Sequence, residues 1–174
     1  MKPIGTKPIR TARLLLRKPH PDDAAALVDI RSLPMTMPEA RKAVASMVEE
    51  CEKPFCFHWV ITLDSQVVGR IKCWEVDPYN GYVQLGYDVG PAYRGQGIMT
   101  EAVGAVICFM LLEAVANRVY CSVRENNHAS RRVCEKNGMI HEGVLRQHYA
   151  RQDGGYDDVH IYGIIKSDLL RGGK

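Results

Sequence analysis

Alternation of apolar and polar residues predicts most of the strands in this chain. The clearest case is 55–63, where five aromatic or aliphatic side chains share one face. Residues 67–76 and 82–89 show a similar pattern and are joined through Asn80-Gly81, a pair typical of tight hairpins. These three segments are therefore predicted to form consecutive antiparallel strands.

Four more segments predict strands at the two ends of the chain. Residues 13–17 contain three consecutive leucines, which predict a first strand buried on both faces. Residues 119–123 alternate again, and a crossover helix before them predicts that this strand is parallel to 82–89. Residues 139–149 and 158–165 are predicted to form a closing hairpin.

Helical spacing of apolar residues predicts four helices. The first follows Asp22 and ends before Pro34, and the second covers about 38–51. The third, from 98 to about 116, is apolar nearly all round and is predicted to be sandwiched in the core. A short fourth helix is predicted to begin at the cap Asn127 and to end near Gly138.

Length and charge favour a single domain over residues 1–174, with 1–10 as a loose lead. The 23 basic and 20 acidic residues are interspersed, so no nucleic-acid partner is predicted. The longest apolar run, 105–112, falls short of the ~20 residues that cross a bilayer, and the N-terminus lacks a signal-peptide core. We therefore expect a cytoplasmic protein without a membrane partner.

Cysteine and histidine spacing predicts neither disulfides nor a metal site. The six cysteines form no C-x-x-C pair and lie mostly in apolar segments, where a thiol behaves as a small hydrophobe. The six histidines show no H-x-x-x-H spacing, so ordinary core or surface positions are expected for them.

The stretch from Gly90 to Ala102 carries the strongest chemical signal. A predicted strand breaks at Gly-Pro and turns through Gly95 and Gly97 into an apolar helix. The free N–H groups and dipole of a helix N-terminus bind phosphate, glycines permit close approach, and Arg94 adds charge. An ordinary strand-to-helix turn explains the same spacing, whereas the dinucleotide and P-loop glycine motifs are not matched.

The segment Arg94-Gly95-Gln96-Gly97-Ile98-Met99 resembles the Q/R-x-x-G-x-G/A signature of the GCN5-related N-acetyltransferases (GNAT). Met99 departs from the small residue at its last position. The resemblance is closest to the branch of ribosomal-protein alanine and serine N-terminal acetyltransferases. It also covers the segments 11–17, 85–87, 127–130 and 135–139.

This resemblance implies an α/β (α+β) fold, with a mixed, mainly antiparallel twisted sheet of about seven strands and about four helices. It implies acetyl-CoA as cosubstrate, no metal, direct transfer to an amine acceptor, and it allows a homodimer. A protein N-terminal α-amine of ribosomal-protein type is the first choice of acceptor. The alternatives are a small amine, such as an amino acid, polyamine or antibiotic, and a CoA-binding sensor without turnover. The acceptor is expected to depend on 31–39 and on the hairpin tip 150–156.

The resemblance also assigns residues to the cofactor. Asp88, Val89 and Gly90 are expected along the pantetheine arm, where a backbone N–H can bind the thioester oxygen. Asn127 is expected to face the pantetheine amides, although a helix cap alone explains an asparagine there. The full predicted set is Asp88, Val89, Gly90, Arg94, Gly95, Gln96, Gly97, Ile98, Met99, Thr100, Asn127 and Ser130.

The catalytic residues are harder to predict. Many relatives place a tyrosine where this chain has Cys134, so Ser130 and Cys134 are the two predicted proton donors for the leaving thiolate, with Ser130 preferred. Gln84 stands where relatives often have a glutamate base, which leaves the base open. His58 and Glu75 are alternatives acting through water, although a solvated histidine and a surface glutamate are the simpler interpretations.

Overall fold

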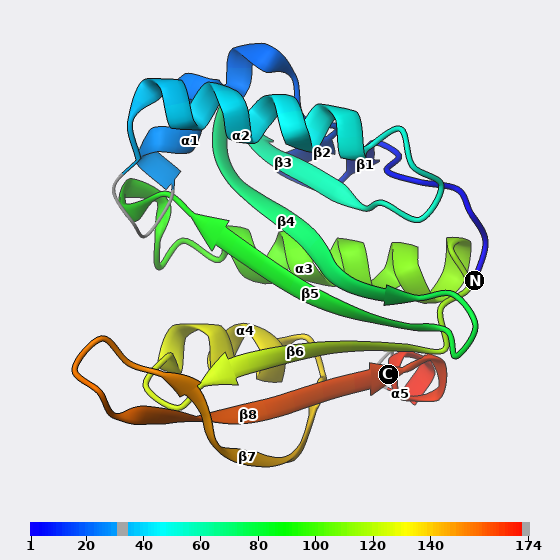
Figure 1. Cartoon of the computed structure of the whole chain (residues 1–174). Coiled ribbons are helices and arrows are strands. Elements are labelled where there is room, and N and C mark those ends of the chain that lie inside the picture. The colour runs from blue at the N-terminus through cyan, green and yellow to red at the C-terminus, as the bar shows by residue number, and fades with distance from the viewer. Residues whose placement is uncertain (31–34, 172–174) are drawn as a thin grey trace.

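The protein is described by a computed structural model that covers residues 1–30 and 35–171 (Figure 1). Within these residues it forms eight strands and five α-helices, against the seven and four expected from sequence. The strands are β1 (Ile9–Arg10), β2 (Leu14–Arg17), β3 (His58–Leu63), β4 (Gln66–Asp77), β5 (Tyr82–Val89), β6 (Arg118–Arg124), β7 (Ile140–Ala150) and β8 (Tyr156–Ile165). The helices are α1 (Ala24–Ile30), α2 (Met37–Glu50), α3 (Ile98–Cys108), α4 (His128–Lys136) and α5 (Lys166–Arg171).

All eight strands belong to one sheet in the order β1-β2-β3-β4-β5-β6-β8-β7. Every neighbouring pair is antiparallel except β5 and β6, which are parallel because α3 carries the chain back between them. The predicted mixed, mainly antiparallel sheet is therefore confirmed. The predicted Asn80-Gly81 turn joins β4 to β5, with Gly81 at a φ of +74°.

Helices cover both faces of the sheet. Figure 1 shows α3 behind β4 and β5, whereas α1 and α2 pack together on the opposite face. The fully buried Trp59 of β3 points toward the α3 layer, where its ring lies edge-on to Phe109 with 5.5 Å between the centroids. Its neighbour Val60 points to the other face and is also buried. β3 is therefore buried on both faces.

The third helix is shorter than predicted. The α-helical part ends at Cys108 and continues as a π-helical turn over Phe109–Glu113, so the predicted end near residue 116 is wrong. Its apolar character is explained by burial, since six of its eleven residues are buried. Among residues 1–30 and 35–171 no helix has the length and apolarity needed to cross a membrane.

The N-terminal segment is more ordered than the predicted loose lead. Ile9–Arg10 pairs with β2, and the buried Thr6 accepts a hydrogen bond from the His58 N–H at 2.8 Å. The expectation for 13–17 also needs correction, because Leu14 and Leu16 are buried whereas Leu15 is only half-buried. The reason is the alternation of side chains along β2, which turns Leu15 to the face opposite Leu14 and Leu16.

β5 and β6 pair only at their first residues. The parallel register runs from Tyr82–Arg118 to Gln84–Tyr120 and then stops. Figure 1 shows the two strands separating toward the ends at which α3 and α4 begin. The second halves of both strands therefore border an opening in the sheet.

Candidate active site

Two adjoining cavities, of about 340 and about 580 Å³, fill this opening. Four residues line both of them: Tyr87, Asp88, Asn127 and Ser130. The smaller cavity is completed by residues of β4, β5 and β6: Arg70, Trp74, Leu85, Gly86, Cys121 and Ser122. The larger is completed by Val89, Tyr93, Arg94, Gly95, Gly97, Ile98, Met99, Thr100, Ala129, Arg132, Val133 and Lys136. A ligand of the larger cavity therefore meets a ligand of the smaller one beside Tyr87 and Ser130.

The glycine turn before α3 forms one wall of the larger cavity. Gly95 and Gly97 have φ angles of +74° and +76°, which only glycine adopts without strain. The first helical hydrogen bond runs from the Glu101 N–H to the Gly97 carbonyl at 3.0 Å. The N–H groups of residues 98–100 therefore precede the hydrogen-bonded part of the helix, and they form an N-terminus suited to an anion.

A carboxylate in the first turn of α3 would weaken this anion site if it were free. Glu101 instead accepts hydrogen bonds from the Thr11 hydroxyl at 2.6 Å and the Arg13 side chain at 2.7 Å. Arg13 also donates to the Gln96 carbonyl at 3.2 Å. Burial alone would raise the pKa of Glu101, but the hydrogen bonds from Thr11 and Arg13 outweigh it and lower the pKa. The ionised carboxylate thus fixes the turn and is neutralised by Arg13.

Three basic side chains line the larger cavity, at Arg94, Arg132 and Lys136. Of these three, only Arg94 was predicted from the sequence. The signal for the other two was present, because residues four apart lie on one face of a helix and these two follow the cap Asn127 on α4. Their charge gives the larger cavity a basic wall suited to phosphate groups.

Ten of the twelve predicted cofactor residues line the larger cavity, and the exceptions are Gly90 and Gln96. The Gly90 N–H already donates to the Val68 carbonyl at 2.9 Å, and the Gln96 amide donates to the Ala92 carbonyl at 2.9 Å. The Gly90 N–H is therefore paired with β4, and the assignment of Gly90 to the pantetheine arm stays a prediction. Because hydrogen bonding alternates along an antiparallel strand, the backbone polar groups of Val89 face the opening instead.

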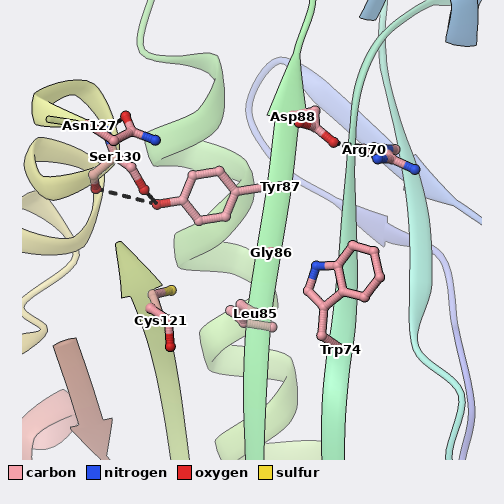
Figure 2. A pocket seen from close by; sticks show the side chains of 10 residues that line it. Arg70, Trp74, Leu85, Gly86, Tyr87, Asp88, Cys121, Asn127 and Ser130 are labelled. Carbon is pink, nitrogen blue, oxygen red and sulfur yellow. Dashed lines mark hydrogen bonds and ion pairs between the residues drawn. The ribbon is translucent and has the colours of Figure 1, made fainter. Parts of the chain in front are cut away.

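The cap of α4 is as predicted. The Asn127 side chain accepts a hydrogen bond from the Ser130 N–H at 3.1 Å. Figure 2 shows both side chains at the start of the helix, facing the ring of Tyr87 on β5. Asn127 thus caps α4 and also lines both cavities. Its roles as a helix cap and as a ligand-facing residue are therefore compatible.

Tyr87 is the main site residue that was not predicted from the sequence. Its hydroxyl lies 2.7 Å from the Ser130 hydroxyl (Figure 2). It also lies 3.7 Å from the Cys134 sulfur. Burial raises the pKa of Tyr87 above its usual range, so the phenol keeps its proton at neutral pH. The alternation of β5 could have predicted this role, since it places Tyr87 on the same face as the buried Leu85. A buried phenol needs a polar partner there.

The two predicted proton donors differ in access. Ser130 lines both cavities, whereas Cys134 is fully buried and lines neither. The Tyr87 hydroxyl, which lines both cavities, lies 3.7 Å from the Cys134 sulfur. The serine is therefore the one of the two that can contact a ligand.

None of the residues considered as a base lines either cavity. Gln84 lies where β5 still pairs with β6, and the Glu75 carboxylate accepts a hydrogen bond from the Tyr120 hydroxyl. His58 is only 1% exposed, so its interpretation as a solvated histidine is wrong. Burial, helped by the nearby Lys72, lowers the pKa of His58 to about 4. The carboxylate of the smaller cavity belongs to Asp88.

Trp74 and an ion pair form the far wall of the smaller cavity (Figure 2). Asp88 accepts hydrogen bonds from the guanidinium of the nearly buried Arg70, at 2.7 and 2.8 Å. The Trp74 indole, 60% exposed, lies against Gly86, where a Cβ would collide with it. This cavity offers a negative charge, a positive charge and an aromatic face to a small polar group.

Comparison with known proteins agrees with the geometry. Residues 13–140 match the family described as Acetyltransferase (GNAT) domain. The Ribosomal-protein-serine acetyltransferase of Escherichia coli is 29% identical over 73% of this chain and 70% of its own length. The "Probable N-acetyltransferase YjcK" of Bacillus subtilis is 30% identical over 76% of this chain and 75% of its own.

Solved structures show the same fold. RimL, a ribosomal L7/L12 alpha-N-protein acetyltransferase in complex with coenzyme A, superposes with a TM-score of 0.82. It is 22% identical, and the superposition covers 94% of this chain and 99% of that one. The chain belongs to the GNAT family and is an N-acetyltransferase.

Proposed function

We propose that this enzyme transfers the acetyl group of acetyl-CoA to the α-amine at the N-terminus of a protein, of ribosomal-protein type. The observation that carries the proposal is the meeting of two different cavities beside Tyr87 and Ser130. The larger has a basic, N–H-rich wall that suits the phosphates of CoA. The smaller has the charges and aromatic surface that suit the end of an acceptor chain.

The residues around the larger cavity fit acetyl-CoA as cosubstrate. The N–H groups of residues 98–100 and the charges of Arg94, Arg132 and Lys136 would hold its phosphates. The unpaired edge of β5 at Val89 would pair with the amides of the pantetheine arm, and Asn127 would contact the same amides. Each assignment uses a group that faces the opening.

The chemistry requires a C–N bond to form and the C–S bond of the thioester to break. The Val89 N–H is the donor suited to negative charge on the thioester oxygen. Ser130 would give its proton to the departing sulfur and regain one from Tyr87, which lies 2.7 Å away, and water in the opening would return the proton to Tyr87. Water in the opening would accept the proton that the amine releases. Positioning of the amine against the thioester supplies much of the rate.

The acceptor assignment rests on the smaller cavity and on the relatives. Asp88 gives the cavity a carboxylate that attracts an ammonium group, while Trp74 offers a flat surface for the first side chain of a peptide. Two of the compared proteins carry names that describe acetylation of ribosomal proteins.

The experiment is thiol release from acetyl-CoA with a panel of acceptors. The panel contains peptides that begin with serine or alanine from ribosomal proteins, the same peptides with blocked N-termini, polyamines and amino acids. We expect a free peptide to give the highest kcat/KM and its blocked form to give none. A small amine with a higher kcat/KM would identify a small-molecule enzyme. Acetyl-CoA binding without release on any acceptor would identify a sensor.

A further inference from the structure

The end of α2 and the start of β3 bring three metal-binding side chains together. Cys51 follows the last residue of α2, Cys56 lies in the connecting loop, and His58 begins β3. One ligand atom from each of the three lies within 4.8 Å of the others. The spacing C-x₄-C-x-H matches no common zinc pattern, so the sequence predicted no metal, and only the fold of the loop unites them.

His58 is the unusual member of this cluster. Its side chain is buried, yet neither ring nitrogen has a hydrogen-bond partner among the residues that the structure describes. An unpaired polar atom in the interior costs free energy, and such atoms in native proteins are rare. The neutral imidazole is also the form that binds metals. A ligand for the ring nitrogen is therefore expected.

We propose that Cys51, Cys56 and His58 bind a zinc ion. Two sulfur ligands and one imidazole suit Zn²⁺, and binding releases the two thiol protons. Typical Zn–S and Zn–N bonds of about 2.3 and 2.0 Å place ligand atoms roughly 3.5–4 Å apart in a tetrahedron. The cluster is thus within about 1 Å of binding geometry, and the half-exposed Cys56 lies in a loop that can close it.

Charge around the cluster is consistent with a divalent cation. Two thiolates neutralise the ion, so the buried site gains no net charge. The fourth position is open to water or to Glu50, whose carboxylate lies 3.9 Å from His58 Nδ1. Glu50 also pairs with Lys72 at 3.0 Å, so a carboxylate at the ion would itself be balanced.

The site ties the end of α2 to β3, on the side of the sheet opposite α3. It lies apart from the two cavities, whose lining includes none of its three residues. Lys72 lies between the cluster and the smaller cavity, since its ammonium pairs with Glu50 and lies 4.8 Å from the centre of the Trp74 ring. The ion would be structural, so the inference stands independently of the proposed reaction.

Cobalt substitution tests the proposal without use of activity. The purified full chain is reduced, stripped with chelator and titrated with Co²⁺. We expect saturation at one equivalent, with the d–d absorption of a tetrahedral site and a sulfur-to-cobalt charge-transfer band. Zn²⁺ should displace the Co²⁺ and abolish both signals.

Variants decide which residues hold the ion. Cys56→Ser, in a half-exposed loop, is expected to fold, to lose most of the charge-transfer band and to bind Zn²⁺ at least about tenfold more weakly. His58→Gln should lose the tetrahedral spectrum, while Cys108→Ser, an exposed cysteine on α3, should change nothing. No uptake of Co²⁺ or Zn²⁺ by the reduced wild type, or equal uptake by Cys56→Ser, would overturn the proposal.

Discussion

The Tyr87 hydroxyl lies 2.7 Å from the Ser130 hydroxyl, across the opening between β5 and α4. This contact joins two cavities that would otherwise be separate features of the surface. It also links the one serine that borders both cavities to a phenol that burial keeps protonated. In the proposed reaction this pair would supply the proton for the leaving thiolate.

Ser130→Ala is predicted to lower kcat more than Cys134→Ala, because only the serine borders the opening. A positioned general acid contributes roughly 100-fold or more, so a loss of about that size is expected for Ser130→Ala. Tyr87→Phe should give a smaller loss, since water can replace the phenol. Steady-state thiol release with saturating acetyl-CoA measures all three. A larger loss for Cys134→Ala would make the thiol the proton donor.

Asn127→Ala is predicted to weaken binding of acetyl-CoA beyond its effect on the fold. The lost cap, a 3.1 Å bond to the Ser130 N–H, is worth about 1 kcal/mol of stability. Asn80→Ala is the matched control, because that side chain bonds to Asp77 in an exposed turn. Calorimetric titration should show weaker acetyl-CoA binding for Asn127→Ala only. Equal affinities in both variants would restrict Asn127 to a capping role.

Trp74→Ala is predicted to raise KM for the acceptor while leaving the affinity for acetyl-CoA unchanged. The indole forms a wall of the smaller cavity and is 60% exposed, so its removal costs little stability. Tyr79→Ala, on the exposed β4–β5 turn, is the control. Initial rates at varied peptide concentration give the KM. An unchanged KM in Trp74→Ala would remove this wall from the acceptor site.

Glu101→Gln is predicted to reduce the free energy of unfolding at neutral pH. It is also predicted to make this free energy decrease less as the pH is lowered into the acid range. The pKa of Glu101 is lowered in the folded protein, so the unfolded state binds the proton first as the pH falls. The stabilisation is present above the unfolded pKa of about 4.3 and is lost as pH falls through the folded pKa. A cost of about 1–3 kcal/mol is expected near pH 7.

Urea unfolding between pH 3 and 7 measures this effect, with Glu113→Gln as the exposed control. If Glu101→Gln kept the acid dependence of the wild type, the carboxylate would not be the group that Thr11 and Arg13 stabilise.

The sequence predicted the parts of the site that depend on local rules. The glycines at 95 and 97, the cap Asn127 and the left-handed Gly138 each follow from one turn or one helix end, and the structure has all of them. The pairing of β5 with β6 followed from the handedness of a crossover.

Contacts between distant segments could not be predicted in this way. The 2.7 Å contact of Tyr87 with Ser130 joins residues 43 positions apart, and it depends on where β5 stops pairing with β6. The buried His58 likewise has neighbours from distant segments, since Thr6 and the end of α2 both lie against the start of β3. The Arg31–Pro34 part of the expected acceptor loop lies outside the described residues. Periodicity assigns a face to a residue, but it does not say which element covers that face.

The central claim is that acetyl-CoA binds between β5 and β6 and against the glycine turn before α3. A substitution in this turn tests the claim most directly. Gly97→Val places a branched side chain at a φ of +76°, on the wall where phosphate would approach. Gly154→Val is the matched control. It creates the same kind of strain at a φ of +85° in the β7–β8 tip, with no atom near the added carbon.

The measurement is the melting temperature with and without acetyl-CoA at about 100 times Kd. At that concentration, mass action should raise the melting temperature of the wild type by roughly 5–10 °C. Both variants should melt lower than the wild type without ligand. Gly154→Val should keep the full rise, and Gly97→Val should show none. A Gly97→Val protein that acetyl-CoA stabilises as much as it stabilises Gly154→Val would contradict the account.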